Sequence, residues 1–451
     1  MQLTVHQLLE AVNGKLLFGS SDTLFRYVST DSRAQMTTEL FIPLVGENHD
    51  GHAYIESAVR NGAVGFLTQR RDVPYAGNFA VLVEDTTKAL GDLASYVLKQ
   101  SHAKVIAITG SVGKTTTRQF VASVVAEHGK TLATSGNFNN HIGLPLTVLK
   151  MEGDEDFLVL EMGMNHFGEI SYLSRLAAPH IAIISLIGTS HIEYLGSREN
   201  ILKAKLEILD GMADDGLLLL NGDDDLLSVV NCKQKIQYFG AKNARYPYTI
   251  VSEAEGTFLM DTDTYQIPIA GAHNIQNASA AVLLGKHLGM TPQQIQNGLS
   301  AFQSVGWRQK TEIVDSVTLI ADCYNASLDS DRAALKVLAN QKSPRKVAVL
   351  GPIGELGDFL EPILNQVGEA VKETKIDCLI CVEEDSKYIR NGASAAGMNS
   401  ENIIYFQKRE DFIKQIPNLF HPGDAVLFKA SRKYQFEELF EHVKQHLQTK
   451  E

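Results

Sequence analysis

A glycine-rich loop, ITGSVGKTTTR, fills residues 108–118 between an apolar segment and a segment with helical periodicity. The backbone N–H groups of such a loop, together with the first turn of the following helix, suit phosphate oxygens. Lys114 would supply a positive charge and Thr115 a hydroxyl directed to Mg²⁺. Ile108 stands where the general GxxxxGK[ST] pattern has glycine. The loop therefore predicts the binding of nucleotide phosphates by a short variant of that motif.

Two further polar residues follow apolar, strand-like segments. Glu161 ends the run FLVLE, and His191 comes directly after IAIISLIGTS. Ligand sites of open α/β sheets lie beyond the carboxyl ends of the strands, so both side chains could reach the crevice of the phosphate loop. A carboxylate at this place commonly holds the metal of a nucleotide. A surface glutamate and an incidental loop histidine stay open as alternatives, and His191 is the weaker candidate on spacing alone.

A lysine occupies an unexpected place in NILKAKLEILDG, residues 200–211. At about 100° per residue, Lys205 shares the apolar side of a helix with Ile201 and Leu209, whereas Lys203 falls on the opposite side. A buried ammonium without a partner is costly or loses its proton. The pattern singles out Lys205 for a chemical role, with a snorkelling or ion-paired lysine as the alternative.

Two asparagine-containing segments are weaker candidates. GNFNNHIGLPL, residues 136–146, contains Asn139 and Asn140 and could be a simple turn or a ligand-binding loop. HNIQNASAAVLLG, residues 273–285, places Asn274 and Asn277 in the first turns of a helix. There they could cap the helix or face a nucleotide base.

The elements that must position these residues alternate between strands and helices. Strand-like runs at residues 105–109, 157–163 and 181–188 are each followed by a loop and a helical pattern. This alternation predicts an α/β fold with a doubly wound, mostly parallel sheet. Residues before about 100 mix short strands with helices, and the strand-then-loop pattern resumes after residue 310. We predict three α/β domains, at residues 1–100, 101–310 and 311–451, of which the last is Rossmann-like.

Composition limits the partners of the chain. A formal net charge of −12 argues against a general binder of nucleic acid or of anionic membranes. The apolar runs of the sequence are shorter than the ~18 residues that a membrane span needs. The first residues, MQLTVHQLLEAVNGK, read as an amphipathic helix and not as a signal peptide. We expect a cytoplasmic protein without membrane insertion, and a monomer.

Together these motifs resemble those of the ATP-dependent Mur ligases, most closely of the MurF type. TGSVGKTTTR is similar to the family's TGxxGKTTT, GNFNNHIGLPLTVL to GNxNNxIGxPxTxL, and EMGMNHFGEI to ExGxxxxGEI. SHIEYLGSRENILKAKLEI, HNIQNASAA and DCYNAS continue the match. Upstream, DSRAQMTTELFIPLVGENHDGHAYIESAVRNGA resembles the first domain shared by the MurE and MurF types. The resemblance runs in order along nearly the whole chain.

The resemblance implies a ligase of peptidoglycan precursor synthesis, and hence a role in cell shape and division. The first domain would hold the UDP-sugar end of UDP-N-acetylmuramoyl-tripeptide, the central domain would hold ATP, and the last domain would close over both. ATP would phosphorylate the terminal carboxylate of the tripeptide. The amine of D-alanyl-D-alanine would then attack the acyl phosphate, giving UDP-MurNAc-pentapeptide, ADP and phosphate.

The resemblance also assigns roles to residues by position. Lys114, Glu161, His191 and Lys205 are expected in catalysis. Two Mg²⁺ ions are expected on Thr115, Glu161, His191 and Lys205, the last being carbamylated by CO₂, a reaction that needs a neutral amine. The residues expected at ATP are Thr109, Gly110, Ser111, Val112, Gly113, Lys114, Thr115, Thr116, Asn274, Asn277, Arg308, Asp322 and Asn325, with Arg308 the nearest candidate for a contact to the γ-phosphate. Those expected at the substrate are Ser32, Arg33, Asn139 and Asn140.

Three features of the last domain depart from the family pattern. Pro352 in GPIGELG replaces the aspartate of GDMxELG, Asn365 stands where a histidine is expected, and KASRKYQF replaces K-G-S-R-x-M. Because this domain should meet the incoming amine, a divergent paralogue with another acceptor, such as another D-Ala-D-X dipeptide, stays open. So does a non-catalytic ATP-binding relative. The third residue of the tripeptide, lysine or diaminopimelate, is open as well.

Overall fold

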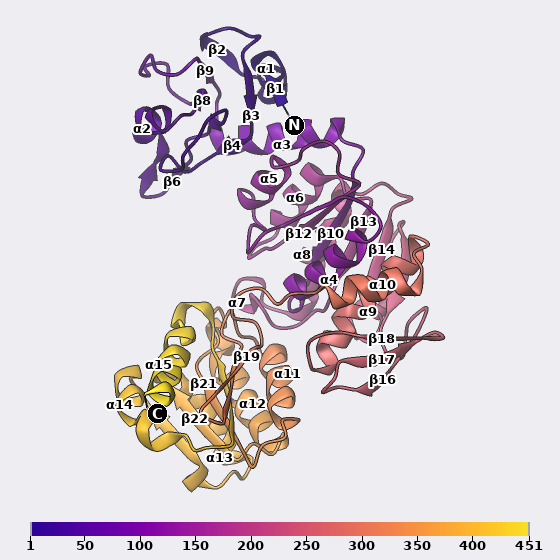
Figure 1. Cartoon of the computed structure of the whole chain (residues 1–451), viewed down its shortest axis with the longest axis vertical. Coiled ribbons are helices and arrows are strands. Elements are labelled where there is room, and N and C mark those ends of the chain that lie inside the picture. Colours follow the sequence, from indigo (N-terminus) through magenta and orange to yellow (C-terminus); the bar gives the residue numbers. More distant parts are fainter. Residues whose placement is uncertain (1, 450–451) are drawn as a thin grey trace.

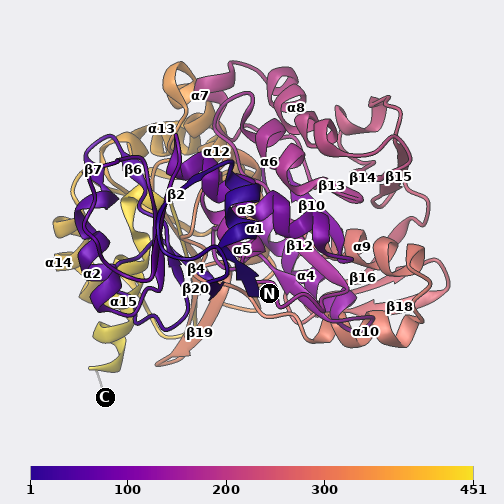
Figure 2. The same cartoon turned by 90° about the horizontal axis from the view of Figure 1, so that it is seen from above.

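The computed structural model describes residues 2–449 and shows three α/β units that follow one another along the chain (Figure 1). The first and the last unit lie on the same side of the central unit, as Figures 1 and 2 agree. The prediction of a three-domain α/β fold is confirmed. The predicted boundaries near residues 100 and 310 fall close to the end of helix α3 at Gln100 and the start of strand β19 at Lys310. That these two positions are the boundaries between independent domains remains a proposal.

The first unit contains a five-stranded sheet, within residues 2–100, in the order β2-β9-β8-β5-β4. Its helix α3 begins behind Asp85, whose side chain accepts hydrogen bonds from the N–H groups of Thr87 and Lys88. Helix α3 packs against α1 of this unit and against α5 and α6 of the central unit, and so joins the two. The elements are β1 (Gln2–Thr4), α1 (Val5–Val12), β2 (Lys15–Phe18), β3 (Leu24–Arg26), β4 (Val28–Ser29), β5 (Leu40–Phe41), β6 (Val45–Gly46), β7 (His49–Asp50), α2 (Ile55–Arg60), β8 (Gly65–Thr68), β9 (Phe79–Leu82) and α3 (Thr86–Gln100).

The central unit is built on a parallel sheet in the order β11-β12-β10-β13-β14-β15. Every residue of β12, β13 and β14 is buried, which explains their unbroken apolar runs. Ile108 pairs with Glu161, and Thr109 pairs with Ile184, so that β10, β12 and β13 end side by side. Its elements to β15 are β10 (Lys104–Thr109), α4 (Lys114–Ala126), β11 (Thr131–Ala133), α5 (Gly143–Val148), β12 (Phe157–Glu161), α6 (Glu169–Ala177), β13 (Ile181–Ile184), α7 (Ile192–Leu195), α8 (Arg198–Leu206), the 3₁₀ turn η2 (Glu207–Gly211), β14 (Leu217–Asn221) and β15 (Lys235–Phe239).

Two features of the central unit differ from the sequence-based expectation. The helix expected through Gly211 ends at Leu206 and continues as the 3₁₀ turn η2, because Ser174 Oγ of α6 donates to the carbonyl of Ile208 and accepts from the N–H of Gly211. An antiparallel three-stranded sheet, which we did not predict, follows β15. The elements of this part are β16 (Tyr248–Ser252), β17 (Thr257–Met260), β18 (Asp263–Gln266), α9 (Ala272–His287) and α10 (Pro292–Ser300).

The last unit has a sheet in the order β19-β20-β24-β21-β22-β23, parallel except for the edge pair β19 and β20. Strand β24 lies between β20 and β21, so the sheet is doubly wound, as a Rossmann-like domain requires. Its elements are β19 (Lys310–Val314), β20 (Val317–Ala321), α11 (Leu328–Ala339), β21 (Arg345–Leu350), the 3₁₀ turn η4 (Gly357–Phe359), α12 (Leu360–Glu373), β22 (Cys378–Val382), α13 (Lys387–Ala395), β23 (Ile403–Phe406), α14 (Arg409–Leu419), β24 (Asp424–Lys429) and α15 (Phe436–Gln448).

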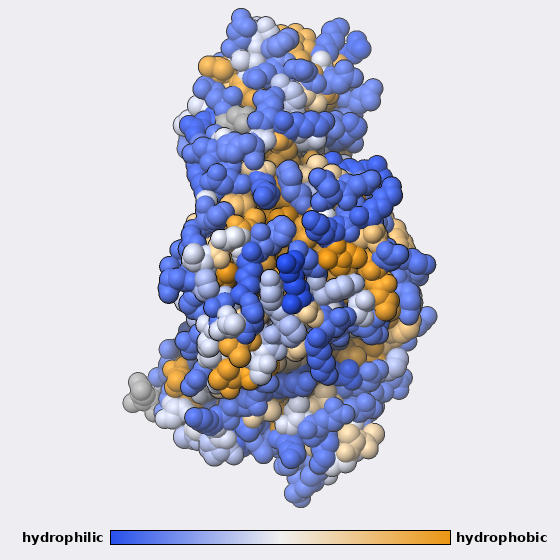
Figure 3. Space-filling view, turned by 90° about the vertical axis from the view of Figure 1, so that its right-hand side faces the viewer, coloured by the Kyte–Doolittle hydropathy of each residue, from blue (hydrophilic) through white to orange (hydrophobic). Residues whose placement is uncertain are grey.

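The face in Figure 3 is largely hydrophilic, with separate hydrophobic patches on its central part. Within residues 2–449, none of the helices combines the length and the apolar character needed to cross a membrane.

Candidate active site

The phosphate loop lies between β10 and the first residue of α4, Lys114, at the carboxyl edge of the central sheet. Gly113 has φ of +86°, a backbone conformation that L residues rarely adopt. A Cβ atom added there would lie 2.5 Å from Oδ1 of Asn277. That oxygen accepts a hydrogen bond of 3.2 Å from Oγ1 of Thr117. The loop therefore needs glycine at this position both for its turn and for the close approach of helix α9.

The Lys114 ammonium is turned onto its own loop, where it donates to the carbonyls of Gly110 (2.8 Å) and Ser111 (3.3 Å). Burial lowers the pKa of Lys114, while the negative charge of Glu161 opposes this shift. Arg308, between the central and last units, donates to Oγ1 of Thr115 over 3.1 Å and covers the ring of Tyr324 at 4.0 Å. Two cations thus converge on the phosphate loop, and the position proposed for Arg308 fits a γ-phosphate contact.

Glu161, the last residue of β12, is buried beside the loop. Its Oε1 accepts a hydrogen bond of 2.9 Å from Asn139, whereas its Oε2 lies 3.4 Å from Nε of Arg118 without forming a hydrogen bond. The carboxylate is therefore held by Asn139 and by the ion pair with Arg118, and one of its oxygens lacks a hydrogen bond. Asn140 accepts from the N–H groups of Ile142 and Gly143 at the start of α5, which is a structural contact.

His191 links the central unit to the last one. Its Nδ1 lies 2.7 Å from Oε2 of Glu355, although the pair is not aligned as a hydrogen bond. Burial lowers the pKa of His191, and the carboxylate of Glu355 opposes this shift. Both residues are non-glycine residues with left-handed backbones, at φ of +64° and +58°. Such strain persists where surrounding contacts hold it, often at functional sites.

The two lysines of helix α8 differ as their helical positions predict. Lys205 is 1% exposed, and within residues 2–449 its ammonium has neither a hydrogen bond nor an ion pair, whereas Lys203 is exposed. Burial, and next the positive charge of Lys114, lower the pKa of Lys205 well below its usual value. Both effects favour the neutral amine of Lys205 over its ammonium.

Two neighbouring cavities open along the phosphate loop. One of about 320 Å³ brings together many of the predicted residues, and one of about 140 Å³ continues toward helix α9. Predicted residues lining the larger cavity are Ser111, Val112, Gly113, Lys114, Thr115, Asn139, Asn140, Glu161, His191, Arg308 and Asn325. Predicted residues lining the smaller one include Thr116, Asn274, Asn277 and Asp322. Thr109 lies behind the loop, where its buried hydroxyl donates to the carbonyl of Met162.

The smaller cavity is lined by polar side chains from helix α9 and from the last unit. Asn274 donates to the carbonyl of Ala270 and to Oε1 of Gln309 and borders the cavity, but it does not cap α9, which has no side-chain cap. Asp322 accepts from Lys429 over 2.7 Å. Lys429 is almost fully buried, and its role was not predicted. The signal in the sequence was a lysine that directly continues the apolar run AVLF.

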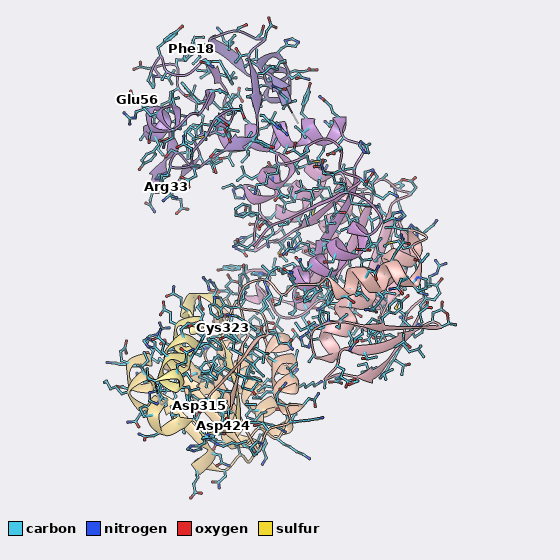
Figure 4. All side chains as sticks on the ribbon, in the orientation of Figure 1. Phe18, Arg33, Glu56, Asp315, Cys323 and Asp424 are labelled. Atoms are coloured by element: carbon cyan, nitrogen blue, oxygen red, sulfur yellow. The ribbon has the colours of Figure 1, made fainter. Side chains whose placement is uncertain are left out.

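The predicted substrate residues Ser32 and Arg33 lie away from these cavities, in the first unit. Arg33 is labelled at the edge of that unit in Figure 4, where it faces toward the last unit. Its guanidinium pairs with Asp31 at 2.9 Å and is largely exposed. The Ser32 carbonyl accepts a hydrogen bond of 2.7 Å from Asn61. Their predicted contact with the UDP end stays a prediction.

The metal prediction can be tested against the side chains present. No group of three or more His, Cys, Asp or Glu residues within residues 2–449 is placed to hold a metal by itself. The larger cavity is nevertheless lined by Thr115, Glu161 and His191. Oε2 of Glu161 and Nδ1 of His191 are buried and lack a hydrogen bond. Mg²⁺ usually takes one or two carboxylates and completes its shell with phosphate oxygens and water. The residues therefore fit a metal that arrives with a nucleotide.

A parallel sheet with a phosphate loop, whose nucleotide cavity is completed by a further α/β domain, defines a multidomain phosphate-loop enzyme. Three family models match in order along the chain: Mur ligase family, catalytic domain (residues 25–97), Mur ligase middle domain (residues 108–285), and Mur ligase, glutamate ligase domain (residues 307–432). The chain belongs to the Mur ligase family, and the resemblance seen in the motifs is confirmed.

The most similar relatives point to one branch of the family. The UDP-N-acetylmuramoyl-tripeptide–D-alanyl-D-alanine ligase of Bacillus subtilis is 38% identical, over 97% of both chains. The protein of the same name from Escherichia coli is 34% identical, over 97% of this chain and 98% of its own. A crystal structure of MurF from Acinetobacter baumannii superposes with a TM-score of 0.91 at 31% identity, covering 99% of both chains. A MurF from Thermotoga maritima in complex with ADP gives 0.83 at 26% identity, covering 94% of this chain and 99% of its own.

Proposed function

We propose that this protein joins D-alanyl-D-alanine to UDP-N-acetylmuramoyl-tripeptide in an ATP-dependent reaction that yields UDP-MurNAc-pentapeptide, ADP and phosphate. Relatives named for this reaction match nearly the whole chain. The observation that carries the proposal is the cavity in which Lys114, Glu161, His191 and Arg308 meet at the edge of the central sheet. These groups come from four separate segments and converge on the place where phosphates would lie.

The chain's own residues can support the transfer of a phosphoryl group. The terminal carboxylate of the tripeptide would attack the γ-phosphorus, and the bond to the β,γ-bridging oxygen would break. Lys114, Arg308 and the first N–H groups of α4 would stabilise the negative charge that spreads over the transferred group. The dipeptide amine would then attack the acyl carbon, forming the amide and releasing phosphate, and its proton would pass to solvent.

We further propose two Mg²⁺ ions, one near Thr115 and Glu161 and one near His191. The metals would neutralise phosphate charge and orient the phosphoryl group. A carbamate on Lys205 would carry a negative charge close enough to Lys114 to be attracted by its ammonium. The first domain would hold the UDP-sugar end through Ser32 and Arg33. We propose a cytoplasmic monomer that binds neither nucleic acid nor membranes.

The decisive experiment measures phosphate release with ATP, Mg²⁺ and UDP-MurNAc-tripeptide, in lysine and diaminopimelate forms, against a panel of D-Ala-D-X dipeptides. We expect release that depends on the dipeptide, with D-alanyl-D-alanine among the best acceptors. Preference for another dipeptide would identify a divergent paralogue with another acceptor, an alternative that the family's aspartate being replaced by Pro352 leaves open. Binding of ATP without release of phosphate in the presence of any dipeptide would indicate a non-catalytic relative and refute the proposal.

A further inference from the structure

The linker that joins the central unit to the last unit, residues 301–309, runs from the end of α10 at Ser300 to the start of β19 at Lys310. Its last two residues, Arg308 and Gln309, both line the smaller of the two cavities along the phosphate loop. Gln309 has a left-handed backbone with φ of +49°, which is uncommon for a non-glycine residue and persists where surrounding contacts hold it. The contacts of Gln309 therefore decide how the chain passes from one unit to the next.

The side chain of Gln309 is bonded to the segment at the start of helix α9, in the central unit. Its Nε2 donates to the carbonyl of Ala270 over 2.9 Å, and its Oε1 accepts from Nδ2 of Asn274 over 2.8 Å. Asn274 also donates to the carbonyl of Ala270 over 2.7 Å, so the three groups close a ring of hydrogen bonds. Asn274 is buried and Gln309 is half-buried, which strengthens these bonds relative to the same bonds in water. Both ends of the Gln309 amide are thus committed to the central unit.

The backbone of the same linker is bonded to the last unit. The N–H of Gln309 donates to Oδ1 of Asp322 over 3.3 Å, and Oδ2 of Asp322 accepts from the buried Lys429 over 2.7 Å. The carbonyl of Trp307 accepts from the N–H of Tyr324 over 3.1 Å. Gln309 therefore connects the start of α9 with the residue that follows β20, through its side chain on one side and its main chain on the other.

Arg308 lies between these anchors and the phosphate loop. Its Cα is about 3.8 Å from that of Gln309, as across any trans peptide, so a fixed Gln309 fixes the base of the arginine side chain. The guanidinium donates to Oγ1 of Thr115 over 3.1 Å and covers the ring of Tyr324 at 4.0 Å. A group that acts on a transferring phosphate needs such fixed placement, because a displacement of ~1 Å can reduce the rate by about 100-fold.

We propose that Gln309 is a positioning residue, which attaches the linker to helix α9 and so holds the guanidinium of Arg308 over the phosphate loop. The inference rests on the function proposed above, in which Arg308 contacts the γ-phosphate, and it adds the residue that places this arginine. Without the Gln309 side chain, the linker stays attached to the last unit through Asp322 but loses its bonds to the central unit. Arg308 then keeps its charge and loses its fixed position.

The test measures the nucleotide affinities of Gln309→Ala by titration calorimetry. The two ligands are MgADP and the Mg²⁺ complex of AMP-PNP, an ATP analogue that keeps the γ-phosphate on a bridging nitrogen. Two hydrogen bonds are lost, so the affinity for MgAMP-PNP should fall by about tenfold. The affinity for MgADP, which has no γ-phosphate, should stay within about twofold and shows that the variant is folded. Gln293→Ala is the matched control, because this exposed glutamine bonds Asn297 within α10, and it should keep both affinities.

A double-mutant cycle with Arg308→Met separates positioning from a merely structural role. Arg308→Met should lower the affinity for MgAMP-PNP at least as much as Gln309→Ala does. Addition of Gln309→Ala to Arg308→Met should change that affinity by less than about twofold, because the glutamine acts through the arginine. Gln309→Gly removes the same side chain and suits the left-handed backbone, so it should reproduce the selective loss.

Several results would overturn the inference. Equal losses for both nucleotides in Gln309→Ala would show that Gln309 shapes only the cavity wall, and wild-type affinities for both would show that its bonds are dispensable. Wild-type affinity for MgAMP-PNP in Arg308→Met, or additive losses in the double variant, would remove the link between the two residues. A loss in Gln309→Ala that is absent from Gln309→Gly would trace the effect to backbone strain. These measurements need no acceptor dipeptide, whereas absence of dipeptide-dependent phosphate release in wild type would refute the proposed function itself.

Discussion

Replacement of Gly113 by alanine should weaken nucleotide binding through a defined steric and conformational cost. The position has φ of +86°, and a left-handed backbone costs an L residue about 1–2 kcal/mol. The new Cβ would lie 2.5 Å from Oδ1 of Asn277, so that side chain must move. Its movement breaks the hydrogen bond from Thr117, which contributes about 0.5–1.5 kcal/mol. Because ATP binding requires the loop in its present shape, both costs oppose binding.

The two contributions together amount to about 1.5–3.5 kcal/mol, or roughly tenfold to 300-fold in affinity. Titration calorimetry with MgADP measures this effect without knowledge of the other substrates. Gly289→Ala is the matched control: Gly289 has φ of +75° in the same unit, and its Cβ would meet no atom within 4 Å. It should lose stability by a similar backbone cost yet bind MgADP as wild type does. An affinity of Gly113→Ala within twofold of wild type would refute the reasoning.

Two other predictions concern buried charged groups. Lys205→Ala should abolish turnover, and either Lys205→Glu or short carboxylates added to the alanine variant should partly restore it. Lys203→Ala, at an exposed lysine of the same helix, should leave turnover unchanged. Full activity of Lys205→Ala in the phosphate-release assay would exclude a carbamate role. Burial raises the pKa of Asp331, 3.8 Å from Lys429, to about 7. The native state therefore keeps a proton that the unfolded chain releases near pH 4, and the free energy of unfolding should fall as pH rises from about 4 to about 7. Asp331→Asn should flatten that decline in denaturant titrations across this range, and an unchanged slope would contradict the assignment.

Local chemistry made the phosphate loop and the central strands predictable. The loop follows from glycine and lysine spacing, and the strands from apolar runs that are buried on both faces. The position of Lys205 was also predictable, because helical periodicity alone placed it on the buried side and Lys203 outside. The exact end of that helix was not, since it depends on contacts from Ser174 of a separate helix.

Contacts between units were beyond the reach of sequence patterns. Glu355 belongs to the GPIGELG motif, yet its approach to His191 joins residues 164 positions apart in the chain. Lys429 pairs with Asp322 across two neighbouring strands of the last sheet. The three-stranded sheet of residues 248–266 was missed because its strands are short and partly polar. In the two ion pairs the deciding interaction is tertiary and leaves no local period in the sequence.

The opposite environments of Lys114 and Lys205 explain how two lysines can serve different chemistry in one site. The positive charge of Lys114 disfavours an ammonium at Lys205, and burial desolvates both side chains. Lys114 has carbonyl acceptors and the charge of Glu161 to stabilise its ammonium, and nucleotide phosphates would stabilise it further. Lys205 has no such acceptor within the described residues, so its environment favours the neutral amine more than that of Lys114 does. A neutral amine can react with CO₂, and the resulting anion would be attracted by the same Lys114 charge that had suppressed the ammonium. The arrangement thus favours carbamylation at Lys205 and phosphate binding at Lys114, and not the reverse.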